Sequence, residues 1–358
     1  MSTEKMLAVV CHAPHDYRVQ EVDRPRPGPG EILVEVGASG ICASDIICYT
    51  GGIGSWGEDG KSGFTEAPVI PGHEFAGTVA ELGDGAGEKH QVALGDRVTA
   101  EQIIPCGECR FCKADQYWMC QPANIFGFKR GRGEGAWAEY MIFPAKSRVH
   151  KLDRRLSLEE GAYIEPLACA IHAVDRAGIK PGDSVVIGGV GNIGLCALQV
   201  ARSFKPGLLV ALDTKPYRLE LACKLGADTL VNALEENASE RVKELTGGYG
   251  CDVYVEMSGN ALAVPPALEM TRCLGTVVAF SVISDPVTLN WSIIGDEKEL
   301  DLRGSHLGPC CYPRAIEAVA EGKVDVKSLI SERYPLAEFP AAMEAARGGN
   351  LKTMLVPR

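Results

Sequence analysis

Four cysteines lie within fifteen residues of one another, a spacing that suits metal binding. Cys106, Cys109 and Cys112 are separated by two residues each, and Cys120 follows after seven more. Thiolates spaced in this way can surround one tetrahedral zinc ion, and four of them leave no coordination position open for a substrate. The spacing therefore predicts a structural zinc site. An iron–sulfur cluster would fit the same spacing, but nothing else in the sequence indicates electron transfer.

Three separated segments carry a second set of possible zinc ligands. Cys42 lies in Gly-Ile-Cys-Ala-Ser-Asp, His73 and Glu74 lie in Pro-Gly-His-Glu-Phe, and Glu165 begins Glu-Pro-Leu. A thiolate, an imidazole and a carboxylate are ligand types of catalytic zinc sites, in which one position stays open. Each residue also has an ordinary alternative, because a histidine after glycine can be structural and a buried acid can cap a helix. The residues alone leave both interpretations open.

A glycine pattern follows an apolar run and opens an amphipathic one, which is the context of a dinucleotide-binding loop. Gly189 permits a tight turn, Gly191 lets a pyrophosphate approach the backbone, and Gly194 lets a helix pack closely on a strand. Asn192 and Ile193 open the predicted helix, whose free N–H groups would face the diphosphate. The alternative is a structural strand–helix turn that binds no dinucleotide.

An acid ends the next predicted strand and indicates which dinucleotide is bound. The carboxylate of Asp213 can accept hydrogen bonds from the adenosine ribose diol, and it would repel a 2′-phosphate. This favours NAD over NADP as the cofactor. Lys215 and Arg218 lie just beyond, and a cation at this place could soften the preference.

Hydrophobic periodicity divides the chain into two kinds of segment. Residues 1–156 carry short alternating or β-branched runs between glycines and prolines, which is typical of a β-rich domain. A helical pattern over 158–177, broken at Pro166, then leads into strands that alternate with helices. This alternation predicts an α/β fold, a doubly wound parallel sheet of Rossmann type. The expected strands are 184–191, 208–213, 229–232, 251–259 and 276–282, and the expected helices are 192–204, 216–226, 238–247 and 261–275.

The pattern changes again after residue 300, with an expected helix over 313–322 and an expected final strand over 351–358. We therefore expect a Rossmann domain over 157–299, inserted into a β-rich domain made from 1–156 and 300–358. The composition of 51–61 predicts a loop. The segment 276–291 is expected to end the Rossmann sheet, where it could pair across a two-fold axis in a homodimer or homotetramer.

Composition excludes several classes of partner. The 358 residues carry a formal net charge of −11 without a basic cluster, so the chain would repel phosphate backbones and anionic lipid. We expect neither nucleic acid nor a membrane as a partner, and the absence of a signal-like or bilayer-length apolar run predicts a cytoplasmic protein. Cysteines outside the two ligand sets are expected to be free and buried. They are Cys11, Cys48, Cys169, Cys196, Cys223, Cys251, Cys273, Cys310 and Cys311.

The order of these motifs along essentially the whole chain resembles that of the zinc-dependent medium-chain alcohol dehydrogenases. The resemblance implies a GroES-like β-rich domain, a structural zinc and a catalytic zinc, and hydride transfer between an alcohol and NAD. It implies that Ser44 passes the substrate proton toward solvent and that Asp45 orients a metal ligand. The catalytic-zinc residues that it implies are Cys42, His73, Glu74 and Glu165. Which of the two glutamates binds the metal directly, and which through water, stays open.

Finer features of the resemblance concern the substrate. Simple-alcohol dehydrogenases have a cysteine at the place of Glu165, and the Glu-Pro-Leu form resembles sorbitol-type polyol dehydrogenases. Longer stretches, among them 101–122, 245–256 and 290–313, look similar to the erythritol/L-threitol dehydrogenases. The implied substrate is a small polyol such as a tetritol, oxidised at a secondary hydroxyl to a ketose. The side chains expected to line its cleft are Tyr49, Trp56, Glu74, Trp118 and His306.

Two alternatives stay open. One is a simple secondary-alcohol or threonine-type amino-alcohol dehydrogenase. The other is a dinucleotide-binding protein without catalysis. Proteins of that second kind usually lack zinc ligands, and this chain retains both sets.

Overall fold

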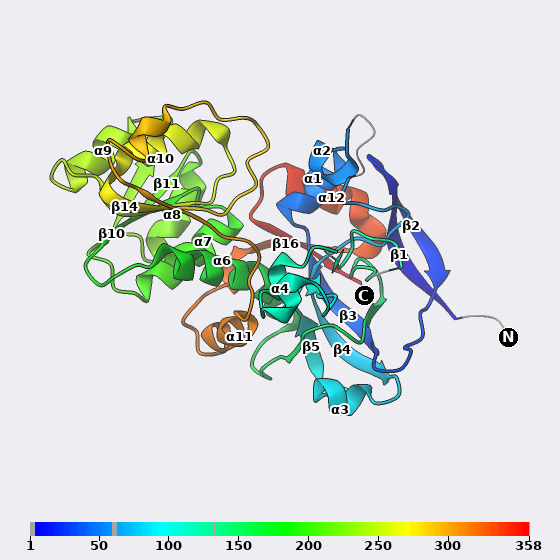
Figure 1. Ribbon diagram of the computed structural model, residues 1–358. Helices are drawn as coiled ribbons and strands as arrows, with labels where there is room; N and C mark the ends of the chain where they lie inside the picture. Colours follow the sequence, from blue (N-terminus) through cyan, green and yellow to red (C-terminus); the bar gives the residue numbers. More distant parts are fainter. Residues whose placement is uncertain (1–3, 59–62, 123, 132, 358) are drawn as a thin grey trace. The chain divides into compact units, whose positions relative to one another are not determined.

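A computed structural model describes residues 4–58, 63–122, 124–131 and 133–357. The chain divides into two compact units (Figure 1), each described by itself below. Unit 1 comprises residues 1–165, 312–322 and 326–358, and unit 2 comprises 166–311 and 323–325. Unit 1 is thus built from both ends of the chain. No helix in the described part of the chain is long and apolar enough to cross a membrane.

Unit 1 is organised around a mixed sheet of seven strands. The strand order is β16-β17-β3-β4-β5-β9, and β8 pairs with β3 off this path. The two-stranded hairpin β1–β2 and the short pair β6–β7 complete the β structure of the unit. Phenylalanines 75, 126 and 143 contact one another in its main apolar core. The strands are β1 Lys5–Ala13, β2 Asp16–Asp23, β3 Ile32–Gly40, β4 Glu74–Leu82, β5 Arg97–Ala100, β6 Ile103–Ile104, β7 Asn124–Ile125, β8 Tyr140–Phe143, β9 Val149–Lys151, β16 Ile330–Pro335 and β17 Lys352–Val356.

Strand pairing in unit 1 brings distant segments together. The antiparallel register of β3 and β4 places Gly40 opposite Glu74. The C-terminal strand β17 pairs with the same end of β3, with Met354 opposite Gly40. Three segments far apart in the sequence therefore meet at the end of β3.

Short helices lie between the strands of unit 1. The prediction of a loop over 51–61 is wrong in part, because Ile53–Trp56 form a helical turn; residues 59–61 lie outside the described residues. The helices and 3₁₀ turns are α1 Ala43–Tyr49, α2 Ile53–Trp56, α3 Ala86–His90, α4 Arg110–Lys113, η1 Tyr117–Met119, α5 Leu158–Ala162, α11 Tyr312–Ala320, η4 Lys327–Leu329, η5 Leu336–Glu338 and α12 Phe339–Arg347.

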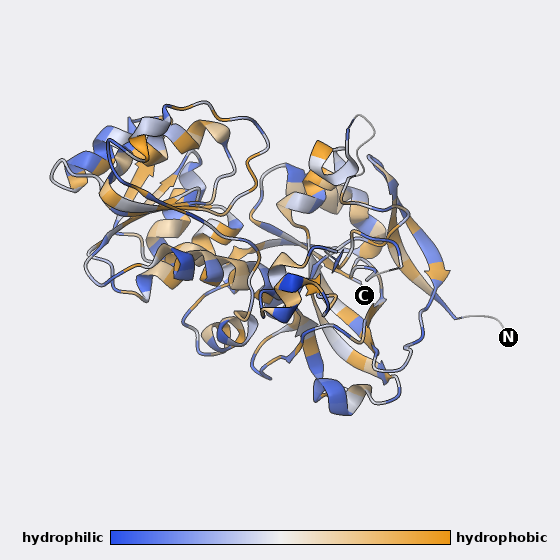
Figure 2. Cartoon of the chain, viewed as in Figure 1, coloured by the Kyte–Doolittle hydropathy of each residue, from blue (hydrophilic) through white to orange (hydrophobic). Residues whose placement is uncertain are grey.

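Unit 2 is a six-stranded parallel sheet with the order β12-β11-β10-β13-β14-β15. This is the doubly wound order of a Rossmann sheet. Figure 1 shows α9 and α10 on one side of the sheet and α6 and α7 on the other, and apolar residues run along the strands in Figure 2. The elements are α6 Ile164–Ala177, β10 Ser184–Gly188, α7 Asn192–Arg202, β11 Leu208–Asp213, α8 Pro216–Lys224, β12 Thr229–Asn232, α9 Ala238–Leu245, β13 Cys251–Glu256, η2 Ala261–Ala263, α10 Val264–Met270, β14 Thr271–Ala279, η3 Trp291–Ile293 and β15 Asp301–Gly304.

Three differences from the predicted elements matter most for the fold. The helical segment 158–177 breaks at Tyr163 and not at Pro166, which lies in the first turn of α6, where its missing N–H is not needed. The predicted helix 261–275 ends at Met270, where β14 begins.

The third difference is at the sheet edge. Segment 276–291 does not end the sheet, because β15 pairs with β14 outside it. The two compact units change at 165/166, 311/312, 322/323 and 325/326. The predicted domain bounds, 156/157 and 299/300, stay a prediction.

Candidate metal sites and dinucleotide loop

The four-cysteine segment folds into a compact lobe. The sulfur atoms of Cys106, Cys109, Cys112 and Cys120 all lie within 4.8 Å of one another. Backbone N–H groups also point at the sulfurs: the N–H of Cys109 donates to Cys106 Sγ at 3.3 Å, and that of Cys106 donates to Cys120 Sγ at 3.4 Å. Such bonds favour the thiolate form, which is the form that binds metal.

The pKa values of the four thiols differ within this lobe. N–H groups of Cys112 and Gln121 lower the pKa of Cys109 to about 6, whereas burial raises the pKa of Cys120 to about 12. Four adjacent thiolates repel one another, so all four ionise together only around a positive ion. The lobe therefore fits a closed, four-sulfur zinc site.

A second cluster joins Cys42, His73 and Glu74, each of which offers a ligand atom within 4.8 Å of the others. Cys42 is the N-cap of α1, and Glu74 begins β4 directly after His73. Gly40 is needed beside them, because a Cβ there would lie 2.0 Å from Glu74 Oε2. Gly72 holds the chain before His73 at φ +99°, a conformation that favours glycine.

Asp45 links two of these residues. Its Oδ2 accepts the backbone N–H of Cys42 at 2.9 Å, and its Oδ1 lies 3.4 Å from His73 Nδ1. Because Nδ1 lies on the side of Asp45, Nε2 is the ring nitrogen left for a metal ion, as in zinc-bound histidines whose other nitrogen faces a carboxylate. Ser44 Oγ lies 3.5 Å from that Nε2.

Burial disfavours a charged imidazole, but the carboxylate of Asp45 raises the pKa of His73 well above its ordinary value. A metal ion that binds His73 would have to displace the imidazole proton that Asp45 stabilises.

Sequence reasoning missed Lys352, which is buried beside Glu74. Its ammonium lies 2.6 Å and 2.7 Å from the two carboxylate oxygens of Glu74, and both side chains are almost fully buried. Burial opposes the ammonium charge, but Glu74 raises the pKa of Lys352 above its ordinary value. A single lysine in a predicted strand that ends in the apolar run Met-Leu-Val was the available signal. This ion pair neutralises Glu74, so a metal must compete with Lys352 for that carboxylate.

Glu165 is buried but stands outside the group of three ligands. The amide Nε2 of Gln102 donates to its Oε1. Gln102, like Lys352, was missed by sequence reasoning. Glu165 also helps to raise the pKa of Lys352, which places its charge near that of the Glu74 pair.

The predicted glycine loop lies in unit 2 between β10 and α7. A Cβ on Gly189, whose φ is +90°, would lie 2.6 Å from the backbone of Ser258, and one on Gly194 would lie 1.9 Å from the carbonyl oxygen of Gly189. Gly191 differs, because the nearest atom to its Cβ position is 3.6 Å away on Arg218. The protein's own packing thus requires the outer glycines but not Gly191, the N-cap of α7. Its open space fits a pyrophosphate in front of Asn192 and Ile193, the first residues of the helix.

Asp213 has a structural role besides the predicted one. At the end of β11, its Oδ2 accepts the backbone N–H of Val190 at 2.8 Å, and its Oδ1 accepts those of Thr214 and Lys215 at 2.7 Å and 3.0 Å. The carboxylate thereby ties the glycine loop to the second strand. Arg218 Nη1 lies 3.9 Å from Asp213 Oδ2, so the cation named from the sequence lies beside the acid.

Side chains that the sequence assigns to a substrate cleft are placed as follows. Tyr49 packs edge-on against Tyr17, and the indole N–H of Trp56 donates to the carbonyl oxygen of Cys48. Trp118 lies in the cysteine lobe, and His306 belongs to unit 2, where burial lowers its pKa.

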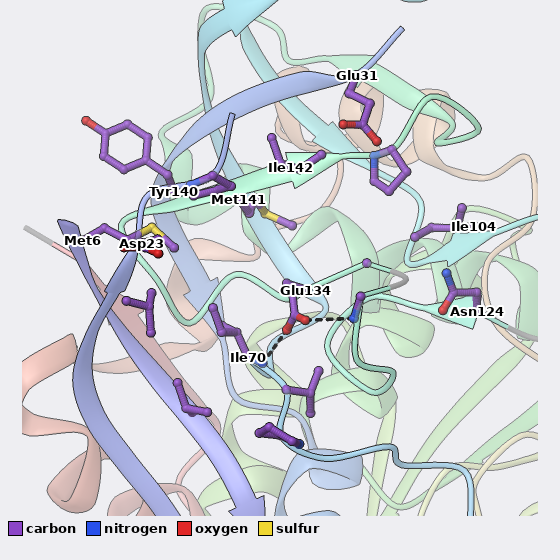
Figure 3. A pocket seen from close by; sticks show the side chains of 18 of the residues that line it. Met6, Asp23, Glu31, Ile70, Ile104, Asn124, Glu134, Tyr140, Met141 and Ile142 are labelled. Atoms are coloured by element: carbon purple, nitrogen blue, oxygen red, sulfur yellow. Dashed lines mark hydrogen bonds between the residues drawn. The ribbon is translucent and has the colours of Figure 1, made fainter. Parts of the chain in front are cut away.

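A separate hollow of about 730 Å³ lies in unit 1 (Figure 3), and none of the predicted site residues lines it. Its walls include Met6, Ile70 and Met141, and the carboxylate of Glu134 accepts the backbone N–H groups of Ile70 and Gly131 beside it. This hollow is not part of either metal site.

Two family models match the chain. The alcohol dehydrogenase GroES-like domain matches residues 28–154, and the zinc-binding dehydrogenase model matches residues 192–321. The erythritol/L-threitol dehydrogenase of Mycolicibacterium smegmatis is 47% identical over 99% of this chain and 98% of its own length. The chain belongs to the zinc-dependent medium-chain alcohol dehydrogenases. It is an oxidoreductase of their polyol branch.

Other members of this family are similar along their whole length. The sorbitol dehydrogenase of Bacillus subtilis is 34% identical over 99% of this chain and 98% of its own. A zinc-binding dehydrogenase from Sinorhizobium meliloti, solved with NADP, has a TM-score of 0.90 at 31% identity and covers 99% of this chain and 100% of its own. The two-domain fold with a Rossmann sheet and a GroES-like domain is therefore confirmed.

The buried ion pair leads to a prediction about stability. We expect Lys352→Met to lower the free energy of unfolding by about 3–5 kcal/mol, because it leaves the Glu74 carboxylate buried without a counter-charge. Urea denaturation of protein with zinc in the four-cysteine lobe only, and no metal at Cys42 and His73, would measure the loss. The matched control is Lys5→Met, which removes the exposed pair with Asp23 and should cost about 1 kcal/mol or less. Equal effects of the two variants would contradict the account.

The two kinds of glycine should respond differently to one methyl group. Gly194→Ala should lower the Tm, because its Cβ overlaps the carbonyl oxygen of Gly189. Gly191→Ala should keep the wild-type Tm without cofactor and raise the Kd for the dinucleotide at least about tenfold, since the methyl group occupies the space for the pyrophosphate. Differential scanning fluorimetry and cofactor titration separate the two effects. A Gly191→Ala protein with unchanged cofactor affinity would count against a diphosphate at this loop.

Proposed function

We propose that this chain is an NAD-dependent zinc dehydrogenase that oxidises a secondary hydroxyl of a small polyol, a tetritol such as erythritol or threitol, to a ketose. The 47% identity with an erythritol/L-threitol dehydrogenase over nearly the whole chain carries the substrate proposal. The meeting of Cys42, His73 and a carboxylate supports the metal chemistry. Two zinc ions per chain are proposed, one in each cysteine-containing cluster.

The residues of unit 1 would have the following roles in the reaction. A zinc ion at Cys42 and His73 would lower the pKa of the substrate hydroxyl, and NAD would accept the hydride. Asp45 fixes the imidazole, and the hydroxyl of Ser44, close to His73 Nε2, can take the substrate proton toward solvent. Glu165 gives the site a carboxylate in place of the second thiolate of simple-alcohol enzymes. Because Lys352 already neutralises Glu74, we propose Glu165 as the carboxylate nearer to the metal's open position.

The dinucleotide is proposed to bind at Gly189, Gly191 and Gly194, with its diphosphate at the N–H groups of Asn192 and Ile193. The charge of Asp213 at the end of β11 supports NAD as the cofactor. We also propose a cytoplasmic homodimer or homotetramer. The exposed Leu302 on the edge strand β15 supports such an assembly.

A second candidate activity comes from other relatives. The L-threonine 3-dehydrogenase of Pyrococcus horikoshii is 33% identical over 97% of this chain and 97% of its own length. Oxidation of a secondary hydroxyl in an amino alcohol uses the same zinc chemistry. The substrate panel below therefore includes this class.

A substrate panel tests the proposed function. The formation of NADH should be compared for erythritol, both threitols, sorbitol, xylitol, L-threonine and 2-butanol at saturating NAD. A tetritol should give the highest kcat/KM, and 2-butanol should be poorer by orders of magnitude, because polar groups built for several hydroxyls would go unpaired. His73→Ala should abolish turnover and leave NAD binding nearly intact. A higher kcat/KM for L-threonine or 2-butanol than for every polyol would overturn the proposal.

Asp213 should set the cofactor preference. The wild type should prefer NAD to NADP in kcat/KM, and Asp213→Ala should narrow the ratio, because it removes both the ribose hydrogen bonds and the repulsion of a 2′-phosphate. The ratio is the decisive readout, since loss of the bond to Val190 loosens the glycine loop for both cofactors alike. A wild-type enzyme that uses NADP equally well would refute the preference.

A further inference from the structure

Two consecutive buried residues connect the cysteine lobe with Glu165. Glu101 and Gln102 follow β5 and are 1% and 2% exposed. Glu101 accepts the hydroxyl of Tyr117, a residue of the lobe, at 2.7 Å. Gln102 has different partners, Tyr312 and Glu165. The same short segment therefore holds the lobe through one side chain and the metal-site carboxylate through the next.

The amide of Gln102 has one orientation that satisfies both partners. A carboxylate only accepts hydrogen bonds, so Glu165 Oε1 must receive the amide N–H of Gln102. The amide oxygen then faces Tyr312, whose hydroxyl donates to it at 3.2 Å. The backbone carbonyl of Gln102 also accepts the N–H of Phe126 at 3.0 Å. Gln102 is thus held at both its backbone and its side chain.

Tyr312 is itself fixed in place. It is fully buried at the start of α11, and its ring stacks on that of His150 with the centroids 5.2 Å apart. His150 Nε2 lies 3.3 Å from Glu101 Oε1. The fixed hydroxyl of Tyr312 restricts the orientation of the Gln102 amide. The amide in turn restricts the orientation of the Glu165 carboxylate.

We propose that Gln102 is the positioning residue of Glu165 at the catalytic metal site, with Tyr312 fixing the orientation of Gln102. This inference rests on the proposed function. Glu74 receives a lysine ammonium, which cancels its charge, whereas Glu165 receives a neutral amide from Gln102. The amide sets the direction of the Glu165 carboxylate and itself adds no positive charge to it.

Three variants test this role. Gln102→Leu removes both hydrogen bonds of the amide, and Tyr312→Phe removes only the hydroxyl and keeps the ring on His150. Tyr117→Phe is the matched control, because it also removes a buried tyrosine hydroxyl but one bonded to Glu101. The readouts are the zinc Kd of the catalytic site by chelator competition, the visible spectrum of the cobalt-substituted protein, and the Tm.

We expect Gln102→Leu to raise the zinc Kd about 10- to 100-fold and to change the cobalt spectrum, the usual scale for partners of metal ligands. Tyr312→Phe should raise the zinc Kd by a smaller factor. If Gln102→Leu does not fold, the zinc Kd of Tyr312→Phe tests the role of Gln102. Tyr117→Phe should alter at most the Tm. If Gln102→Leu and Tyr312→Phe both gave the zinc Kd and the cobalt spectrum of Tyr117→Phe, the role of Gln102 would be overturned. The proposed function would not be affected by that result. A wild type that binds no second metal would overturn the proposed function as well.

Discussion

The buried ion pair between Glu74 and Lys352 is the interaction on which the metal-site half of the molecule depends. Unit 1 buries the acids Asp45, Glu74 and Glu165, and a buried charge without a partner is costly. Each acid finds compensation from a different part of the chain: Asp45 lies against His73, Glu74 against the C-terminal strand, and Glu165 against Gln102. Lys352 reaches Glu74 only because β17 pairs with β3 at the end where β4 begins. The same sheet register thus closes the fold and balances the charge of the site.

Unit 2 presents its ligand site by different means, since a dinucleotide carries negative charge. Neutral backbone N–H groups at the start of α7 face the place of the diphosphate, and the glycines keep side chains out of it. The carboxylate of Asp213 accepts three backbone N–H groups, so it organises the loop. The two proposed sites therefore differ, since the one in unit 1 relies on buried side-chain charge and the one in unit 2 relies on backbone dipoles.

Local patterns in the sequence predicted most of the elements and the ligand segments. The four cysteines lie within fewer than twenty consecutive residues, and so do the glycines of the loop. Their spacing is therefore informative without a structure. Lys352 and Gln102 could not be found in this way, because their role is set by strand pairing and packing across long separations. The helix break at Tyr163 and the edge strand β15 were missed for a related reason: a proline is tolerated in a first turn, and a short exposed strand has a weak pattern. Tertiary contacts determine the place of the helix break and the edge strand, as well as the roles of Lys352 and Gln102.

The central claim is that this enzyme holds a second zinc ion at Cys42 and His73 besides the one in the cysteine lobe. Anomalous diffraction at the zinc absorption edge, from crystals of protein that is active before crystallisation, tests it most directly. The account predicts two peaks per chain, one among the four sulfurs of Cys106, Cys109, Cys112 and Cys120 and one in contact with Cys42 Sγ and His73 Nε2. An active enzyme with a single peak in the cysteine lobe would contradict it.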